Sequence, residues 1–514
     1  MSSFNALPVA ESLLNLRDPQ CKENLESWQP ILQKFEAASR HVTTEATPSS
    51  LIKHQSRGQL LARDRISLLL DEDSPFLELC AYAGFQQDDA PPCANLIAGI
   101  GSICARPCLV LSHIPTQSGG AWNEFTVPKQ NRVTEIATEN HLPIVALVQS
   151  AGVFLPQQFK VFHAGGQIFR DLARRSQLGQ QSCAIVFGSS TAGGAYHPAL
   201  SDYSIFVKDQ AQVCDEFGRR IQIATDEFDA IRKGREWVAS LGQWPLPPVA
   251  AAHAPLPPRY SIEDILSIVD PDIRKPFNMR EIILRLVDDS RLSEFKPSYG
   301  PNLLTCFANI MGHSVGIVAN QVPVINTDEA SKGAQFIRLC NQSNLPIVFL
   351  HNVTGFMVGT KAEHAAIIKK GAQLVSAVSC STVPHISVIL GASYGAGNYA
   401  MCGRPYKPRF LFTWPIGRCS VMGPDQLAGV MQTIEANSAK SKGKQVDGAA
   451  AEKRTQSLKD SVQRDSESYR TSAALLDDGV IDPRDTRDVV GMCLEVVKMP
   501  GVQGASAHRV LARM

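Results

Sequence analysis

The chain has 514 residues, and its 50 Lys and Arg residues against 49 Asp and Glu residues give a formal net charge of +1. This balance leaves no excess charge that would attract the chain as a whole to nucleic acid or to an anionic membrane. Its 13 cysteines are scattered singly, without a C-x-x-C pair, so neither a structural metal site nor a secreted disulfide framework is expected. No run of 18 apolar residues is present, so the sequence predicts no membrane-spanning helix.

The N-terminal segment, residues 1–85, is predicted to be a helical lead-in to the first domain. The stretch RGQLLARDRISLLLDEDSPFLEL contains apolar residues at helical spacing: Leu60, Leu61, Ile66, Leu69 and Leu70. The first residues of the chain mix acidic with apolar side chains, unlike an arginine-rich transit peptide or a secretory signal.

Two glycine-rich stretches resemble each other, GSSTAGGAY at 188–196 and GASYGAGNY at 391–399. A second pair, LPIVALVQSAGVFLP from Leu142 and LPIVFLHNVTGFMVG from Leu345, has the same offset of 203 residues. In each copy, apolar β-rich runs alternate with helical segments, which predicts an α/β fold of mixed sheets layered with helices. The sequence therefore predicts a duplicated domain.

We expect the first copy over residues 86–243 and the second over 261–514. Residues 244–260, WPLPPVAAAHAPLPPRY, are rich in proline and lack apolar periodicity, which predicts a semi-rigid linker between the copies. A charged stretch near 433–470 is poor in apolar residues and is predicted to form an exposed helical arm of the second domain.

A glycine-rich turn between a strand and a helix can take part in chemistry. Without side chains, its main-chain N–H groups can point into a cleft, and two such donors at a helix N-terminus stabilise an oxyanion. The alternative is that such a turn only packs a helix against a strand. Two equivalent turns, one in each repeat, favour a pair of oxyanion sites facing a shared cleft.

The second turn also matches another motif. Residues 391–395, Gly-Ala-Ser-Tyr-Gly, fit the G-x-S-x-G nucleophile elbow of serine hydrolases, and Asp478 and His508 follow in hydrolase order. The equivalent stretch, 188–192, lacks the final glycine, and the chain has no HGGG-type loop. The oxyanion hypothesis explains both copies, whereas the elbow explains one.

The second half contains an ordered series of blocks: PFNMREIILRLVDDSRLSEFK, SKGAQFIRLC, NVTGFMVG, GASYGAGNYAMCGR, SVMGPDQLAGV and DDGVIDPRDTR. Together with GSSTAGGAYHPALSD in the first half, this series resembles the carboxyltransferase β subunits of biotin-dependent acyl-CoA carboxylases, most closely those acting on methylcrotonyl-CoA and geranyl-CoA. The resemblance implies two crotonase-like (ClpP/crotonase) domains, with acyl-CoA against the first and carboxybiotin against the second. It also implies a homo-oligomer with its active site at a dimer interface.

The resemblance assigns roles by position. Gly193 and Gly194 would hold the acyl thioester oxygen, and Ala396 and Gly397 would hold the ureido oxygen of biotin. Further substrate contacts are implied for Ala192, Gly119, Gly120, Gly152, Gly355, Phe356 and His364. No side chain is expected to bind a metal or to act as a covalent nucleophile. No cofactor is expected to be attached to this chain, since it has no M-K-M biotinylation site; carboxybiotin would come from a biotin-carrying α subunit.

The sequence departs from the family near both expected sites. Residues 117–120 read Gln-Ser-Gly-Gly where relatives have V-K-G-G, and 149–152 read Gln-Ser-Ala-Gly where relatives have D-S-G-G, so two charges are missing. A glycine-rich loop after Gln210 is absent. Residues 364–367 read His-Ala-Ala-Ile where relatives have A-G-G-I, which places two methyl groups near the expected biotin path, at an overpacking cost of about 1–3 kcal/mol.

These departures leave two other functional classes open. One is a repurposed crotonase-fold enzyme that performs decarboxylation, thioester hydrolysis or double-bond isomerisation without biotin. His364 is the side chain expected to carry such a changed chemistry, whereas His197 is expected to be a hydrogen-bonded structural histidine. The other class is a non-catalytic scaffold subunit of a carboxylase. Biotin-dependent turnover and acyl-CoA binding distinguish the three classes.

The sequence predicts an intracellular protein with reduced thiols. The final tripeptide, Ala512-Arg513-Met514, is a variation on the S-K-L peroxisomal signal. The family resemblance implies the mitochondrial matrix instead, and a cytoplasmic location stays open.

Overall fold

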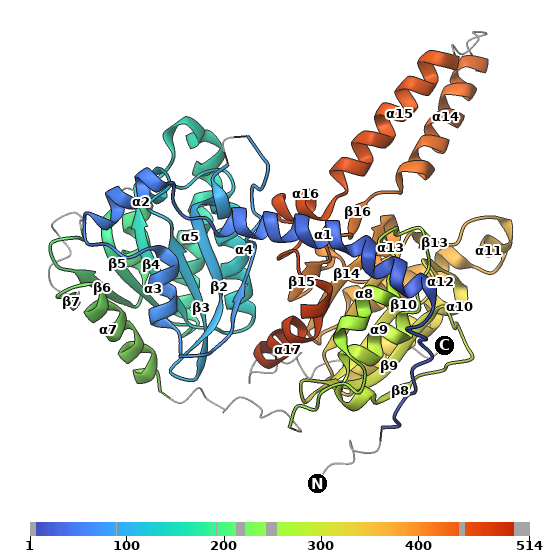
Figure 1. Cartoon of the computed structure of the whole chain (residues 1–514), viewed down its shortest axis with the longest axis horizontal. Coiled ribbons are helices and arrows are strands. Elements are labelled where there is room, and N and C mark those ends of the chain that lie inside the picture. The colour runs from blue at the N-terminus through green and yellow to red at the C-terminus, as the bar shows by residue number, and fades with distance from the viewer. Residues whose placement is uncertain are drawn as a thin grey trace.

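The chain folds into two lobes, each built around a seven-stranded sheet, and a pair of helices projects from the second lobe (Figure 1). This computed structural model describes residues 7–88, 90–191, 193–211, 222–242, 254–441 and 448–497. No helix in these ranges is both long enough and apolar enough to span a membrane.

The first sheet has its strands in chain order from β1 to β7. They are β1 (Phe76–Glu78), β2 (Leu96–Ile103), β3 (Arg106–His113), β4 (Ile144–Ser150), β5 (Ser182–Ser190), β6 (Tyr203–Val207) and β7 (Gln222–Ala224). The first three strands pair antiparallel and the others pair in parallel. The lobe's helices are α4 (Thr126–Glu139), α5 (Gln158–Gln177), α6 (Gly193–Leu200) and α7 (Glu227–Ser240). Every residue of β4 is buried, as expected for a parallel strand whose two faces are covered.

The second sheet repeats this plan. Its strands are β8 (Leu292–Glu294), β9 (Leu303–Ile310), β10 (His313–Asn320), β12 (Ile347–Val353), β14 (His385–Tyr394), β15 (Phe410–Thr413) and β16 (Arg418–Ser420). A small parallel sheet joins β11 (Val324–Ile325) to β13 (Gly355–Phe356). The helices of this lobe are α8 (Ile265–Ile268), α9 (Met279–Leu286), α10 (Thr327–Gln342), α11 (Thr360–His364), α12 (Ile367–Ser379), α13 (Gly395–Ala400), α16 (Ser468–Ala473) and α17 (Thr486–Val497).

The duplication extends to a backbone irregularity. The strand that precedes each turn, β5 or β14, pairs in parallel with β4 or β12, and both pairings slip register at equivalent places: between Val148 and Ser150 of β4 and between His351 and Val353 of β12. These positions have the same offset of 203 residues as the sequence motifs. The predicted α/β fold with duplicated domains is therefore confirmed.

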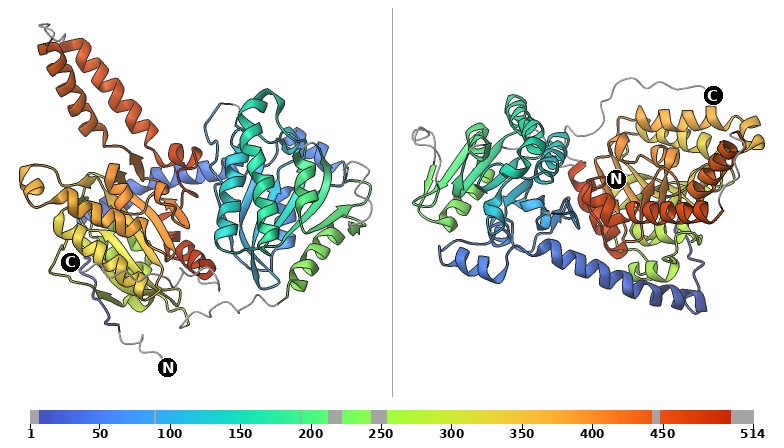
Figure 2. Two further views of the ribbon diagram at one scale, coloured as in Figure 1. Left: turned by 180° about the vertical axis from the view of Figure 1, so that it is seen from behind. Right: turned by 90° about the horizontal axis from the view of Figure 1, so that it is seen from above.

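The long helix α1 (Pro19–Thr43) spans both lobes (Figure 2, right). In its first half, Trp28 Nε1 donates to the carbonyl oxygen of Val269 in the second lobe at 2.8 Å. Near its end, Ser39 Oγ lies 2.8 Å from Tyr82 Oη in the first lobe. The segment predicted as a lead-in to the first domain thus packs against both lobes. It continues into α2 (Pro48–Gln55) and α3 (Ala62–Leu69), which packs against the first sheet.

The element boundaries differ from the predicted domain limits at two places. The first sheet begins with β1, which precedes residue 86. The projecting arm consists of α14 (Pro424–Ser441) and α15 (Gly448–Asp465), so it begins before residue 433 (Figure 1). Most of the predicted linker at 244–260 lies outside the described residues.

The two lobes meet at a buried carboxylate. Arg132 of α4 donates from Nε and Nη2 to the two carboxylate oxygens of Asp478, at 2.8 and 2.9 Å. Arg404 of the second lobe donates from Nη2 to the same carboxylate at 2.7 Å, and Leu411 N–H donates to it at 2.9 Å. Burial by itself would raise the pKa of Asp478, but the two guanidinium groups outweigh this effect and hold the pKa well below its usual range.

The adjacent carboxylate behaves in the opposite way. Asp477 is buried and accepts hydrogen bonds from Thr413 Oγ1 at 2.9 Å and from Gly479 N–H at 3.1 Å. No arginine binds it directly among the described contacts, and burial raises its pKa to about 6.

We expect Asp478→Asn to lower the free energy of unfolding by about 3–5 kcal/mol, because it removes the buried carboxylate that both guanidinium groups bind and leaves Arg132 with Glu135 alone as its charged partner. Urea unfolding measures this loss. The control is Asp272→Asn, which breaks the solvent-exposed pair with Arg274 and should cost less than about 1 kcal/mol. Equal losses in the two variants would contradict the larger contribution that we assign to the buried carboxylate of Asp478.

Asp477 should make the stability depend on pH. Because its pKa is raised to about 6 in the folded chain, the folded state binds this proton more tightly than the unfolded state does. Its contribution to the free energy of unfolding therefore falls as pH rises from about 4 to about 6. Asp477→Asn should remove this slope. Unfolding curves at several pH values test the effect, and a stability difference between variant and wild type that stays constant over this window would refute it.

Candidate active site

The first glycine turn joins β5 to α6. Ser190 Oγ donates to the carbonyl oxygen of Gly194 at 2.8 Å, and Gly194 N–H donates to the carbonyl oxygen of Thr191 at 2.9 Å. A thioester oxygen bound by Gly194 N–H would compete with Thr191 for this donor. The roles of Gly193 and Gly194 therefore stay predictions, and Ala192 lies outside the described residues.

The other glycines predicted for the acyl-CoA side lie together. Ala151 N–H donates to the carbonyl oxygen of Gly119 at 2.9 Å, and Ser150 Oγ donates to the carbonyl oxygen of Gly120 at 2.8 Å. Gly152 N–H donates in turn to Ser150 Oγ at 3.2 Å. These bonds join the loop after β3 to the loop after β4.

The first turn contacts these loops. A Cβ atom built on Gly194 would lie 3.5 Å from Ser150 Cβ, and one built on Gly120 would overlap the carbonyl oxygen of Gln149. Gly120 also has φ +69°, a conformation in which other residues are strained. The structure thus brings Gly119, Gly120, Gly152 and Gly194 together. We call this cluster the first half-site, and the cluster around the second turn the second half-site.

Gln149, which replaces an expected aspartate, has a structural role in this lobe. Arg65 Nη1 donates to its Oε1 at 2.9 Å, and its Nε2 donates to Gln59 Oε1 at 3.2 Å. Arg65 is fully buried and forms a two-pronged ion pair with Glu227 at 2.8 and 2.9 Å. A Cβ atom on Gly188 would lie 2.6 Å from Gln149 Nε2, so glycine leaves the space for this amide.

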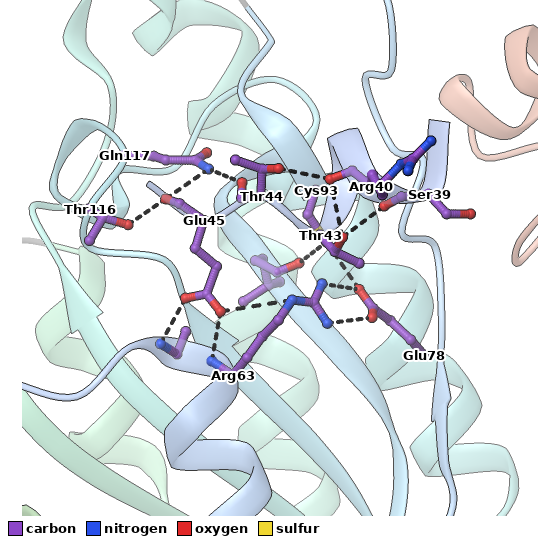
Figure 3. Close-up of polar contacts among 12 residues, drawn as sticks. Ser39, Arg40, Thr43, Thr44, Glu45, Arg63, Glu78, Cys93, Thr116 and Gln117 are labelled. Carbon is purple, nitrogen blue, oxygen red and sulfur yellow. Dashed lines mark hydrogen bonds and ion pairs between the residues drawn. The ribbon is translucent and has the colours of Figure 1, made fainter. Parts of the chain in front are cut away.

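Gln117 stands where relatives have the valine of V-K-G-G. It joins the first half-site to the N-terminal segment. Its Nε2 donates to the carbonyl oxygens of Thr44 and Glu45 at 3.0 and 3.1 Å (Figure 3). The carboxylate of Glu45 in turn accepts the N–H of Arg63 at 2.9 Å at the start of α3. The segment that directly follows α1 therefore holds the loop that carries Gly119 and Gly120.

The second turn joins β14 to α13 and is more crowded than the first. A Cβ atom on Gly395, which has φ +50°, would lie 2.8 Å from the carbonyl oxygen of Val421. A Cβ atom on Gly397 would lie 2.6 Å from Val353 Cγ2 and 3.2 Å from the backbone of Gly355. The structure thus brings Gly355 and Gly397 together.

Strand β16 lies beside this turn and is tied to α1. Arg418 of β16 pairs with Glu467 at 3.4 Å, and Glu467 pairs with Lys34 of α1 at 3.4 Å. Because β16 pairs with the end of β14 from Ala392 to Tyr394, these charges support the strand that leads into the turn.

An apolar groove of about 350 Å³ has Ala396 of the second turn in its lining. Its lining includes Phe356, Val358, Ile367, Ile368 and Val375. The predicted residues Phe356 and Ala396 therefore share one groove.

His364 does not line this groove. It ends α11, is exposed, and is absent from the groove lining, which includes the neighbouring Glu363 instead. Ala365 and Ala366 are also exposed, so their methyl groups do not overpack an interior of this chain. The cost of Ala366 is instead backbone strain, because it adopts φ +62° and ψ 40° at the start of α12.

We expect Ala366→Gly to raise the free energy of unfolding by about 1 kcal/mol, because glycine adopts this left-handed conformation without strain. The matched control is Ala365→Gly, at φ −80°, which should give no gain because alanine is relaxed there. Chemical unfolding of the two variants and the wild type measures the difference. A gain at residue 365 equal to that at 366 would refute the assignment of strain.

The serine of the nucleophile-elbow hypothesis is inaccessible. Ser393 is fully buried within β14; its Oγ lies 3.0 Å from His351 Nδ1 and accepts from Asn398 Nδ2 at 2.8 Å. Asp478 is bound by two arginines at the lobe interface, and His508 lies outside the described residues. The geometry gives no support to a serine hydrolase site.

His351 and Asn398 were missed by sequence reasoning. Their signal is the presence of polar residues in a buried strand end and directly after a glycine turn. His197, by contrast, is the structural histidine that was expected: it is buried, its Nδ1 lies 3.2 Å from Gln130 Nε2, and burial lowers its pKa to about 3.

The described parts of the chain contain no group of three or more His, Cys, Asp or Glu side chains arranged to hold a metal ion. The two turns lie in different lobes, since β5 belongs to the first lobe and α13 to the second (Figure 1).

Residues 53–215 and 210–511 match the family described as carboxyl transferase domain. The chain belongs to this carboxyl transferase family. The resemblance inferred from the sequence motifs is thereby confirmed, as is the prediction of a carboxyltransferase of the β-subunit type.

Individual relatives of this carboxyl transferase support the assignment. It is 43% identical over 489 residues to a Mycobacterium tuberculosis protein described as a biotin-dependent acyl-coenzyme A carboxylase β2 subunit, covering 89% of this chain and 91% of that protein. It is 39% identical over 507 residues to the mitochondrial methylcrotonoyl-CoA carboxylase β chain of Arabidopsis thaliana, covering 92% and 86% of the two chains. Among solved structures, the geranyl-CoA carboxylase β subunit of P. aeruginosa superposes with a TM-score of 0.88 at 35% identity, over 98% of this chain and 100% of that one.

Proposed function

We propose that this carboxyl transferase moves a carboxyl group from carboxybiotin to the enolate of an acyl-CoA. The observation that carries this proposal is the pair of equivalent glycine turns, each following a buried parallel strand and opening a helix. The reaction develops negative charge on two oxygens, the thioester oxygen of the acyl-CoA and the ureido oxygen of biotin. One turn for each oxygen matches this requirement.

In this proposal, the N–H groups of Gly193 and Gly194 stabilise the enolate oxygen, with Ala192, Gly119, Gly120 and Gly152 around the acyl-CoA. The N–H groups of Ala396 and Gly397 stabilise the ureido oxygen, and Gly355, Phe356 and His364 lie on the biotin side. Carbon dioxide released from N1-carboxybiotin is attacked by the enolate, and the biotin nitrogen that loses it serves as the base. The chain contributes positioned dipoles rather than an acid, a base or a metal ion.

The two half-sites of one chain lie in separate lobes, so we propose that a complete site forms between two copies. Exposed apolar side chains near the first turn support this: Leu155, Phe159, Phe162 and Tyr196. Near the second turn, the exposed side chains are Val358, Ile368 and Tyr399. Leu155 and Val358 occupy equivalent repeat positions, as do Tyr196 and Tyr399. Burying such faces against each other would remove apolar surface from water and close the site.

The carboxybiotin would be delivered by a separate biotin-carrying subunit, as the names of the related β subunits support. For the cellular compartment, the mitochondrial designation of the Arabidopsis relative supports the mitochondrial matrix, and fluorescence imaging of the tagged chain tests this.

The deciding experiment incubates the purified protein with a panel of acyl-CoAs and their carboxylated forms, with and without free biotin, and identifies the products by mass spectrometry. We expect loss of the carboxylate from a carboxylated acyl-CoA only when biotin is present. Turnover that ignores biotin would favour the repurposed crotonase-type enzyme. No turnover together with no acyl-CoA binding would favour a scaffold subunit.

Gly397→Ala should lower the biotin-dependent rate by about 100-fold, because a methyl group placed against Val353 and Gly355 displaces the main chain of the turn. The matched control is Gly429→Ala in α14, where a new Cβ atom meets nothing within 4 Å. Steady-state kinetics of both variants, with circular dichroism to verify folding, make the comparison. A folded Gly397→Ala protein with wild-type activity would rule out the assigned role of this turn.

A further inference from the structure

We propose that the buried serines beneath the two glycine turns are positioning residues, and that each one governs a different substrate. Ser190 would set the geometry of the acyl-CoA turn, and Ser393, through His351 and Asn398, that of the carboxybiotin turn. This inference rests on the proposed function and extends it to side chains that touch neither substrate.

The two serines occupy equivalent places in the repeats. Ser190 pairs with Ser150 across the first sheet, and Ser393 pairs with Val353 across the second, each directly after the register shift of its strand. Both side chains are buried, with exposures of 2% and 0%. A hydroxyl buried at the last step before each turn has to bond to something close by, and in both lobes it bonds to the helix that the turn opens.

In the first lobe, the bond is direct. Ser190 Oγ donates to the carbonyl oxygen of Gly194 at 2.8 Å. This single bond ties the opening of α6 to the end of β5. It therefore restrains the peptide groups around the N–H donors assigned to the thioester oxygen.

In the second lobe, the bond is part of a network of three side chains. Asn398 Nδ2 donates to Ser393 Oγ at 2.8 Å, which leaves the hydroxyl proton of Ser393 to be donated to His351 Nδ1, 3.0 Å away. Burial lowers the pKa of His351 to about 3, so this imidazole is neutral. In the tautomer that carries its proton on Nε2, Nδ1 accepts the Ser393 hydroxyl proton. The network joins β12, β14 and α13.

The position of the second network along the chain is what links it to the reaction. Ala396 and Gly397 lie between Ser393 and Asn398, so the Ser393–Asn398 hydrogen bond closes a short loop around the two N–H groups assigned to the ureido oxygen. Asn398 is further fixed because its carbonyl oxygen accepts Gly403 N–H at 2.8 Å. A misplacement of such donors by about 1 Å is enough to lower a rate about 100-fold.

The Ser190–Gly194 hydrogen bond and the Ser393–His351–Asn398 network are not interchangeable. The residues equivalent to His351 and Asn398 in the first repeat are Val148 and Ala195, which cannot form this network. A buried polar network is costly unless every member is satisfied, and apolar side chains could fill the same volume. The network is present under the second turn alone, so we infer that this turn needs it. Separate KM values for biotin and for the acyl-CoA can detect such a difference between the turns.

The test uses the full chain in its assembled form and the biotin-dependent decarboxylation of the carboxylated acyl-CoA that the substrate panel identifies. We expect Ser393→Ala to raise the KM for free biotin at least about 10-fold and to leave the KM for the acyl-CoA within about twofold. Ser190→Ala should show the reverse pattern. Asn398→Ala should reproduce the effect of Ser393→Ala.

Ser387→Ala is the matched control. Ser387 lies on the same strand, is equally buried, and donates to the carbonyl oxygen of Cys402, beyond the end of α13, at 2.8 Å. It should leave both KM values unchanged while altering the unfolding midpoint as much as Ser393→Ala does. If Ser393→Ala does not fold, Ser393→Cys replaces the hydroxyl oxygen by a larger sulfur that forms weaker hydrogen bonds, and the same shift in biotin KM is expected.

Equal changes in the two KM values for each serine variant, or no change in either, would overturn the inference and leave the serines as ordinary packing residues. Absence of biotin-dependent turnover in the wild-type protein is a different result. It would overturn the proposed function, and the inference with it.

Discussion

The carboxylate of Asp478 is the interaction on which the arrangement of the two lobes depends. It is buried, and it is bound by Arg132 from the first lobe and Arg404 from the second. The backbone of the same residue accepts Cys80 N–H at 2.7 Å, so the contact is made by main chain as well as side chain. Separating the lobes would leave buried charges without partners, which is costly even where forming the pair brings little net stability. Each half-site therefore has a fixed position relative to the other within one chain.

Both lobes contain the same strand–turn–helix arrangement. A buried parallel strand shifts register against its neighbour, ends in a glycine-rich turn and leads into a helix. Because the proposed chemistry uses main-chain N–H groups, the side chains beneath each turn are free to differ between the repeats. The first half-site is backed by Gln149 and Arg65, and the second by His351, Ser393 and Asn398. Conserving the backbone while the supporting side chains diverge is what a duplicated oxyanion turn permits.

Much of the fold was predictable because its signals are local. The repeat offset identified the duplication, and the glycine-rich stretches marked the two turns. Contacts between distant residues could not be predicted in this way. The sequence indicated a helical lead-in but not that α1 contacts both lobes, and the partner of Ser393 is His351 on another strand. The sequence also does not show the left-handed turn at Ala366, beside which His364 is exposed at the end of α11; the role of His364 stays a prediction.

Helix α1 has a thermodynamic consequence. The residues that directly follow it, Thr44 and Glu45, accept the Gln117 side chain beside the first turn, and Lys34 of the helix reaches β16 through Glu467 and Arg418. The helix thus connects the supports of both turns. If a ligand moved the Gln117 loop and with it α1, the support of β16 would change, and linkage would require the reverse effect to be equal in free energy. If two copies pair as proposed, the two turns of one chain would serve different sites, and this reciprocity would run between active sites rather than within one.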